Sequence, residues 1–224
     1  MLPIHQQLNN LKSQLPEQVQ LVAVSKTKPV SVILHAYEAG QRVFGENKVQ
    51  ELQAKYPEMP KDIQWHMIGH LQTNKVKYIA PWIHMIHSVD RMKLLRSINK
   101  EAAKAERTID CLLQFHIAEE DTKFGLDMQE AEQMLESDSF HGFGNVRICG
   151  VMGMATFTED MGQVRREFKH LKSIFEQLKT RFFPNSDAFS EISMGMSADY
   201  KIAIEEGATM VRVGSIIFGA RDTH

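Results

Sequence analysis

Short apolar segments alternate along the chain with longer amphipathic segments. Each apolar segment is rich in Val, Ile, Leu, Met or aromatic residues, and a loop with Gly, Ser, Asn or Asp usually follows it. A short continuous apolar run is typical of a parallel β-strand that is covered on both faces. Eight candidate strands are present: LVAVS from Leu21, RVFGE from Arg42, WHMIG from Trp65, IHMIHSV from Ile83, DCLLQFHI from Asp110, VRICGVM from Val146, FSEIS from Phe189 and MVRVGS from Met210.

The clearest amphipathic segment extends from Met161 to Phe182 and predicts a helix. Asp160 precedes it, at a position where the helix dipole favours a carboxylate. Its Arg and Lys residues lie between the apolar positions and indicate a solvated face rather than a nucleic-acid site. The apolar positions recur in steps of four and three, which places them on one helical face: Val164, Phe168, Leu171, Phe175, Leu178 and Phe182.

Strands that alternate with helices indicate βαβ units and a parallel sheet. Eight such units predict a single-domain (β/α)8 TIM barrel over residues 1–224, with a leading helix within residues 1–20 and the barrel from about Leu21. An open doubly wound sheet is the structural alternative. Its first turn is usually rich in glycine, whereas here the first strand runs into Ser-Lys-Thr-Lys-Pro at residues 25–29.

Composition and charge exclude several classes of protein. The chain has 26 Lys and Arg against 28 Asp and Glu, a net charge of -2, which is not the basic field of a nucleic-acid binder. No segment approaches the roughly 20 apolar residues of a membrane-spanning helix, and the N-terminus does not resemble a signal peptide. Cys111 and Cys149 lie in apolar segments, so we expect buried thiols in a reducing, cytoplasmic compartment.

In a parallel barrel the residues that follow each strand meet at one mouth, where chemistry occurs. The loops after the last two strands commonly bind phosphate in this fold, and here both are built from Ser and Gly. Such residues let backbone N–H groups approach an anion closely, although they could also simply cap a helix and turn the chain. The candidate mouth residues include Lys26, Asn47, His70, Ser193, Ser197, Gly214 and Ser215; Ser197 is also a candidate helix N-cap.

Lys26 and Arg212 add a second kind of chemistry to this mouth. Lys26 ends a strand of Leu, Val and Ala, where desolvation lowers a lysine pKa and favours condensation with a carbonyl group. An ion-paired or solvated lysine is the alternative. Arg212 interrupts an apolar strand, and its charge must be paired, either by an internal carboxylate or by a ligand. A lysine, an arginine and a phosphate site suit pyridoxal 5'-phosphate (PLP) or a sugar phosphate in a Schiff-base aldolase.

Several motifs in the chain resemble one known family. VAVSKTKP, FGENKVQE, WHMIGHLQTNK, GVMGMAT and SMGMSADYKIAIEEGATMVRVGSIIFGAR are similar to those of the pyridoxal phosphate homeostasis protein family. The resemblance covers residues 21–221 and implies a fold similar to the barrel domain of alanine racemase. It implies that Lys26 forms the internal aldimine with PLP and that Arg212 lies beside the pyridine nitrogen. It further implies phosphate contacts from Ser193, Ser197, Gly214 and Ser215, with Asn47 and His70 near the ring.

The resemblance also implies a role in intracellular PLP (vitamin B6) homeostasis. We expect a carrier without catalysis, because an alanine racemase needs a second domain that supplies a tyrosine base, and the chain has no residues left for one. A PLP-dependent amino-acid racemase-like enzyme is the alternative. PLP is the expected ligand, PLP-dependent apoenzymes are candidate recipients, and the expected assembly is a monomer or weak homodimer.

Ten histidines raise the question of a metal site. His66 and His70 fall on one side of a predicted strand, whereas His84 and His87 are expected to face opposite sides. Neither pair has a nearby cysteine or carboxylate that would complete a ligand set. We therefore expect no metal site.

Overall fold

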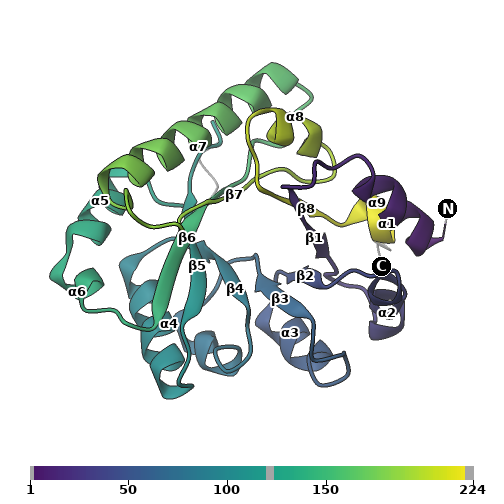
Figure 1. Ribbon diagram of the computed structural model, residues 1–224, viewed down its shortest axis with the longest axis horizontal. Coiled ribbons are helices and arrows are strands. Elements are labelled where there is room, and N and C mark those ends of the chain that lie inside the picture. Colours follow the sequence, from purple (N-terminus) through teal and green to yellow (C-terminus); the bar gives the residue numbers. More distant parts are fainter. Residues whose placement is uncertain (1–2, 120–123, 220–224) are drawn as a thin grey trace.

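The computed structural model describes residues 3–119 and 124–219 and shows a closed barrel of parallel strands in the order β1 to β8. Figure 1 shows the strands around a central axis with the helices outside them. The strands are β1 (Gln20–Val24), β2 (Val43–Glu46), β3 (Gln64–Met67), β4 (Met85–Val89), β5 (Ile109–Phe115), β6 (Val146–Gly153), β7 (Glu191–Ser193) and β8 (Met210–Val213). The barrel closes because β8 pairs with β1, with Leu21 opposite Val211.

Helices connect the strands and cover the outside of the barrel (Figure 1). The longest, α7 (Met161–Arg181), begins at Asp160, whose carboxylate accepts hydrogen bonds from the N–H groups of Gly162 and Gln163. This cap satisfies donors that have no partner within the helix. The others are α1 (Ile4–Lys12), α2 (Val30–Glu38), α3 (Val49–Lys55), η1 (Thr73–Tyr78), α4 (Met92–Lys104), α5 (Met128–Glu136), α6 (Asp138–His141), α8 (Tyr200–Glu205) and α9 (Ser215–Phe218).

The predicted fold is confirmed, with differences at the ends of some elements. Every candidate strand overlaps an observed strand, and the predicted helix over residues 161–182 is α7. The leading helix is shorter than predicted, because α1 occupies only Ile4–Lys12 and a turn and loop connect it to β1. The ends of the predicted domain, residues 1–2 and 220–224, lie outside the described residues, as do residues 120–123 after β5.

Two groups of buried apolar side chains hold the barrel together. The larger one joins the outer faces of the strands to the helices and includes Phe44, Trp65 and Phe168. The smaller one comprises Met85, Leu112, Cys149, Met152 and Met210. Each buried Leu or Met contributes about 1.5–3 kcal/mol to stability. Within residues 3–119 and 124–219, no helix has the length and apolar character needed to cross a membrane.

Candidate functional site

A cavity of about 430 Å³ lies among the residues that follow β1, β2, β6, β7 and β8. Six predicted site residues line it, and they lie in or directly after four of the strands, β1, β2, β7 and β8: Lys26, Asn47, Ser197, Arg212, Gly214 and Ser215. Thr156, Phe157 and Thr158, from the loop after β6, form another part of the wall. The structure therefore brings together most of the polar groups that the sequence placed at the mouth.

Two predicted site residues do not line this cavity. Ser193 is fully buried, and its Oγ accepts a hydrogen bond from Nη1 of Arg212 at 2.6 Å, on the interior side of the site. His70 has an exposed side chain, with Nδ1 at 3.5 Å from Oδ2 of Asp90 and its ring against Phe124. The predicted roles of Ser193 at a phosphate and of His70 near a ring therefore stay predictions.

The loops after β7 and β8 meet through one hydrogen bond. The N–H of Gly214 donates to Oγ of Ser197 at 3.4 Å, so the hydroxyl lies beside the backbone that leads into α9. Ser197 is not the N-cap that the sequence suggested, because α8 begins one turn later, at Tyr200, with Asp199 before it. The hydroxyl of Ser197 is thus directed to the cavity loops rather than to the start of α8.

Arg212 lies in the interior of the barrel at the base of the cavity and is only 4% exposed. Its guanidinium donates to Oγ of Ser193 and, through Nη2, to the carbonyl oxygen of Gly153 at 3.0 Å. Burial lowers the pKa of Arg212 to about 10, and the carboxylate of Asp199 acts in the opposite direction. Arg212 therefore stays a cation at neutral pH and can donate further hydrogen bonds to a ligand.

Polar groups hold the backbone on both sides of Lys26. Lys55 donates to the carbonyl oxygen of Ser25 at 3.0 Å and to Oε1 of Glu46 at 2.6 Å. The hydroxyl of Ser25 donates to the same Oε1 at 2.6 Å. On the other side, the N–H of Thr27 donates to Oε2 of Glu51, which also accepts from Lys55 at 2.9 Å. We call Glu46, Glu51 and Lys55 the lysine clamp, because they fix the backbone before and after Lys26.

The lysine clamp explains an unusual backbone conformation. Thr27 has a φ of 65°, a left-handed conformation that is rare for a β-branched residue. Its N–H bond to Glu51 stabilises this conformation, which turns the chain sharply after Lys26. The lysine clamp was not predicted from the sequence. A signal was present, since Glu51 and Lys55 have the i, i+4 spacing of a helical ion pair.

The side-chain oxygen Oδ1 of Asn47, which lines the cavity, is buried without a hydrogen-bond partner among the described residues. The backbone of Asn47 packs directly on Gly69, where an added Cβ would lie 2.4 Å from the carbonyl oxygen of Asn47. A buried acceptor without a partner costs about 1–3 kcal/mol, so a ligand donor at this position would be stabilising.

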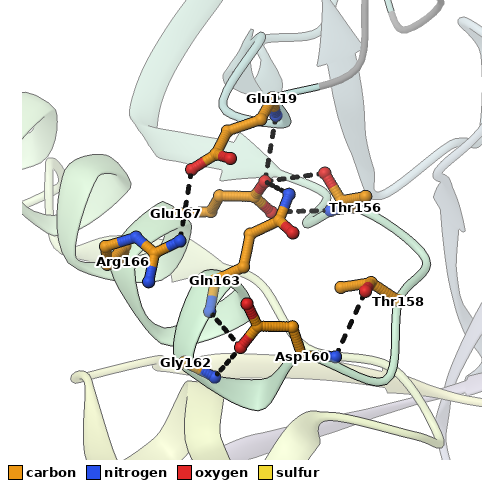
Figure 2. A network of polar contacts seen from close by, with 8 residues as sticks. All are labelled: Glu119, Thr156, Thr158, Asp160, Gly162, Gln163, Arg166 and Glu167. Carbon is orange, nitrogen blue, oxygen red and sulfur yellow. Dashed lines mark hydrogen bonds and ion pairs between the residues drawn. The ribbon is translucent and has the colours of Figure 1, made fainter.

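A second polar network holds the loops on the far wall of the cavity (Figure 2). The carboxylate of Glu167, on α7, accepts bonds from both the N–H and the hydroxyl of Thr156, each at 2.6 Å. It also accepts from the N–H of Glu119 at 2.9 Å and from Nε2 of Gln163 at 3.1 Å. Glu167 therefore connects the loops after β5 and β6 to α7.

The Glu167→Gln variant is expected to lose about 2 kcal/mol of folding free energy, because an amide has only one acceptor oxygen for four donors. Burial alone would raise the pKa of Glu167, but its hydrogen bonds from Thr156, Glu119 and Gln163 lower it. The contribution of the ionised Glu167 to the free energy of unfolding is thus fully present above the ordinary glutamate pKa. It is lost as pH falls through the lowered pKa of Glu167 in the folded protein. Denaturant unfolding of the wild-type protein and of Glu167→Gln, at neutral and at acidic pH, measures this contribution.

The exposed Glu176, on the same helix, provides the matched control. Its ion pair with Lys172 has a separation of 3.7 Å, and Glu176→Gln should change stability by less than about 0.5 kcal/mol. Equal effects of the two substitutions at neutral pH would contradict the role given to Glu167.

In the described part of the chain, no group of three or more His, Cys, Asp or Glu side chains is arranged so that it could hold a metal ion. The expectation that His84 and His87 face opposite sides was wrong. Both rings contact His66, at centroid distances of 5.4 and 4.9 Å. His84 precedes β4, which begins at Met85, so strand alternation does not apply to it.

The site combines an amine, a guanidinium, an amide oxygen and a Ser/Gly anion pocket in one cavity. The protein is thus a parallel (β/α)8 barrel whose cavity, with these polar groups, lies at the carboxyl ends of its strands, where barrels of this class have their ligand sites. No tyrosine is among the residues that line the cavity within the described ranges.

Comparisons with known proteins identify the family. Residues 3–222 match the family model described as alanine racemase, N-terminal domain. A pyridoxal phosphate homeostasis protein of Aquifex aeolicus is 38% identical over 203 residues, which cover 90% of this chain and 87% of that relative. The chain therefore belongs to the pyridoxal phosphate homeostasis protein family, within the wider alanine racemase N-terminal domain family.

Solved structures agree with this assignment. PipY of Synechococcus elongatus without PLP matches 96% of this chain and all of its own chain, with a TM-score of 0.90 and 36% identity. The structure of PipY with PLP bound gives a TM-score of 0.86 and 35% identity over the same shares of the two chains. An alanine racemase of Clostridium difficile shares the fold, with a TM-score of 0.75 at 12% identity.

Proposed function

We propose that this protein binds PLP in the cavity and holds it covalently through Nζ of Lys26, as part of the intracellular maintenance of PLP. The single observation that carries the proposal is the convergence of Lys26, Arg212, Ser197 and Gly214 on one cavity. The relatives support it, because they are named pyridoxal phosphate homeostasis proteins and the PipY structure has PLP bound.

The residues present fit the three polar ends of PLP. Ser197, Gly214 and Ser215 supply hydroxyl and backbone donors for the phosphate, in loops that already contact each other. Lys26 supplies the amine for the aldehyde, and Arg212 lies at the base of the cavity for the pyridine nitrogen. The buried Oδ1 of Asn47, which has no described partner, supplies an acceptor beside the ring.

The covalent link is a condensation that needs no further reagent. An amine and an aldehyde condense with loss of one water molecule, so Lys26 would hold the aldehyde of the cofactor without any other reactant. The lysine clamp keeps the backbone on both sides of Lys26 in place and so directs the amine into the cavity. Arg212 donates hydrogen bonds and has no acceptor, so a ring nitrogen held against it would be unprotonated, and the cofactor would supply only weak electron withdrawal.

A weakly activating site favours the role of a carrier. Such a protein would release PLP to PLP-dependent apoenzymes and would act as a monomer or weak homodimer in the cytoplasm. The two cysteines, Cys111 and Cys149, are free and buried, which suits a reducing compartment.

Ser197→Ala is expected to weaken the affinity for PLP about ten- to a hundredfold without unfolding the protein, because one hydrogen bond to a charged phosphate is lost. Its hydroxyl also accepts the N–H of Gly214, so the loop becomes less ordered as well. Fluorescence titration with PLP measures the effect, and pyridoxal without its phosphate is the control ligand. An equal loss of affinity for PLP and for pyridoxal in Ser197→Ala would mean that Ser197 does not contact the phosphate.

Competition with other aldehydes tests the proposal as a whole. PLP should bind and change the absorbance spectrum of the protein, whereas glyceraldehyde 3-phosphate should neither bind tightly nor be trapped by borohydride. Trapping of the sugar phosphate but not of PLP would instead support a Schiff-base aldolase.

A further inference from the structure

Four polar side chains form a hydrogen-bonded row across the interior of the barrel. Nδ1 of His66 lies 2.8 Å from Nε2 of His87, and Nδ1 of His87 lies 2.9 Å from Oγ of Ser193. Ser193 accepts from Arg212 at 2.6 Å. We call these four residues the interior row. It joins β3 and β4 to β7 and β8, on the opposite side of the barrel (Figure 1).

Three of the four residues of the interior row lie out of contact with solvent. His66, His87 and Ser193 are at most 1% exposed. His66 is in register with Met85 on β4, and Ser193 with Met152 on β6. Burial lowers the pKa of His66 to about 3 and that of His87 well below its usual value, with the Arg212 cation acting in the same direction on His87. Both rings are therefore neutral, and each carries one N–H.

The cation at one end sets the direction of the hydrogen bonds. A guanidinium has no acceptor, so Ser193 accepts from Arg212, and the serine proton needs a different partner. Among the described contacts of this hydroxyl, only Nδ1 of His87 can accept it. His87 then carries its proton on Nε2 and donates to Nδ1 of His66. The proton of His66 is left on Nε2, which has no partner among the described residues.

The opposite direction satisfies fewer groups. If His66 donated to His87 and His87 donated to Ser193, the serine hydroxyl would have no described acceptor. The unprotonated Nε2 of His66 would lack a partner as well. Each buried polar group without a partner is costly, so the direction that starts at Arg212 is favoured.

We propose that His87, supported by His66, is a positioning residue for Arg212. Nδ1 of His87 accepts the hydrogen bond of the Ser193 hydroxyl and so keeps a lone pair of that oxygen directed at the guanidinium of Arg212. Ser193 thereby acts on the ligand through Arg212. The consequence for PLP affinity rests on the proposed function, whereas the direction of the row and the placement of Arg212 are properties of the protein alone.

Two isosteric substitutions at His87 separate the two ends of its ring. In His87→Asn, the amide oxygen takes the place of Nδ1 and still accepts from Ser193. In His87→Gln, the amide reaches the place of Nε2 and contacts His66, but Ser193 loses its acceptor. We expect His87→Asn to retain PLP affinity within about twofold and His87→Gln to weaken it about tenfold, the effect of one hydrogen bond. Because the two variants alter the same buried position, general packing damage would affect both.

Nitrogen NMR of the protein without PLP provides the direct test. The proposal predicts a proton on Nε2 and none on Nδ1 of His87 in the wild-type protein. It also predicts distinct, slowly exchanging Nη signals from Arg212 that persist in His87→Asn and are lost in His87→Gln. A proton on Nδ1 of His87, or unchanged Arg212 signals in a folded His87→Gln protein, would overturn it. Failure of the wild-type protein to bind PLP would contradict the proposed function. It would not affect the test of the interior row, because the proton position on His87 and the Nη signals of Arg212 are both measured without PLP.

Discussion

The Lys26→Ala variant is expected to show no visible absorbance band with PLP and no PLP trapped by borohydride. The methyl group of alanine cannot form the carbon–nitrogen bond, whereas the Ser/Gly loops and Arg212 remain in the cavity wall. Reversible binding through the phosphate should therefore persist at lower affinity. Absorbance titration measures the loss of the band, and equilibrium dialysis measures the residual binding.

A matched control separates the cavity lysine from lysines in general. Lys104 has an exposed side chain and an i, i+3 ion pair with Glu101 at the end of α4. Lys104→Ala should leave the band, its intensity and the trapped PLP unchanged. A band of wild-type intensity in Lys26→Ala would move the covalent link to another lysine.

The Lys55→Met variant is expected to lose about 3–5 kcal/mol of folding free energy at pH 8, because removing one partner of a buried ion pair leaves the other uncompensated. Lys55 is 6% exposed and Glu46 is fully buried, with Nζ and Oε1 at 2.6 Å. The same substitution at the exposed Lys104 should cost less than about 0.5 kcal/mol. Denaturant unfolding of both variants measures the difference.

The loss in Lys55→Met should depend on pH in a defined direction. Burial already raises the pKa of Glu46 to about 7, although Lys55 and Ser25 act against it, and without Lys55 the pKa rises further. Between the ordinary glutamate pKa and this raised value, the folded state binds more protons than the unfolded state. The free energy of unfolding of the variant therefore falls as pH rises through this range.

Replacing both charges provides the control for this explanation. In the Glu46→Gln, Lys55→Met double variant the carboxylate of Glu46 is no longer present, so most of the stability at pH 8 should return and its dependence on pH should flatten. A double variant as unstable as Lys55→Met would mean that lost packing of the lysine side chain, rather than the charge on Glu46, causes the effect.

The fold was predictable because parallel strands buried on both faces leave a strong apolar pattern. The strand ends at Lys26, Asn47 and Gly214 also followed from that pattern, since the barrel brings such ends to one mouth. The pattern failed where strands are short or interrupted. β7 has only three residues, and His84 lies before β4, so alternation misplaced its side chain.

The supporting contacts of the site were not predictable from local spacing. Ser193 and Ser197 both belong to one Ser/Gly segment, yet one points into the barrel towards Arg212 and the other contacts the loop of Gly214. His66, His87 and Ser193 come from three separate strands, and only closure of the barrel brings them together. Sequence periodicity gives the face of a strand on which a residue lies but not its partner across the interior.

Borohydride reduction of the wild-type protein with PLP, followed by peptide mass mapping, tests the central claim most directly. We expect a visible absorbance band that disappears on reduction, and a single pyridoxyl-modified peptide that contains Lys26. Absence of the band, or modification of Lys28 or another lysine in place of Lys26, would contradict it.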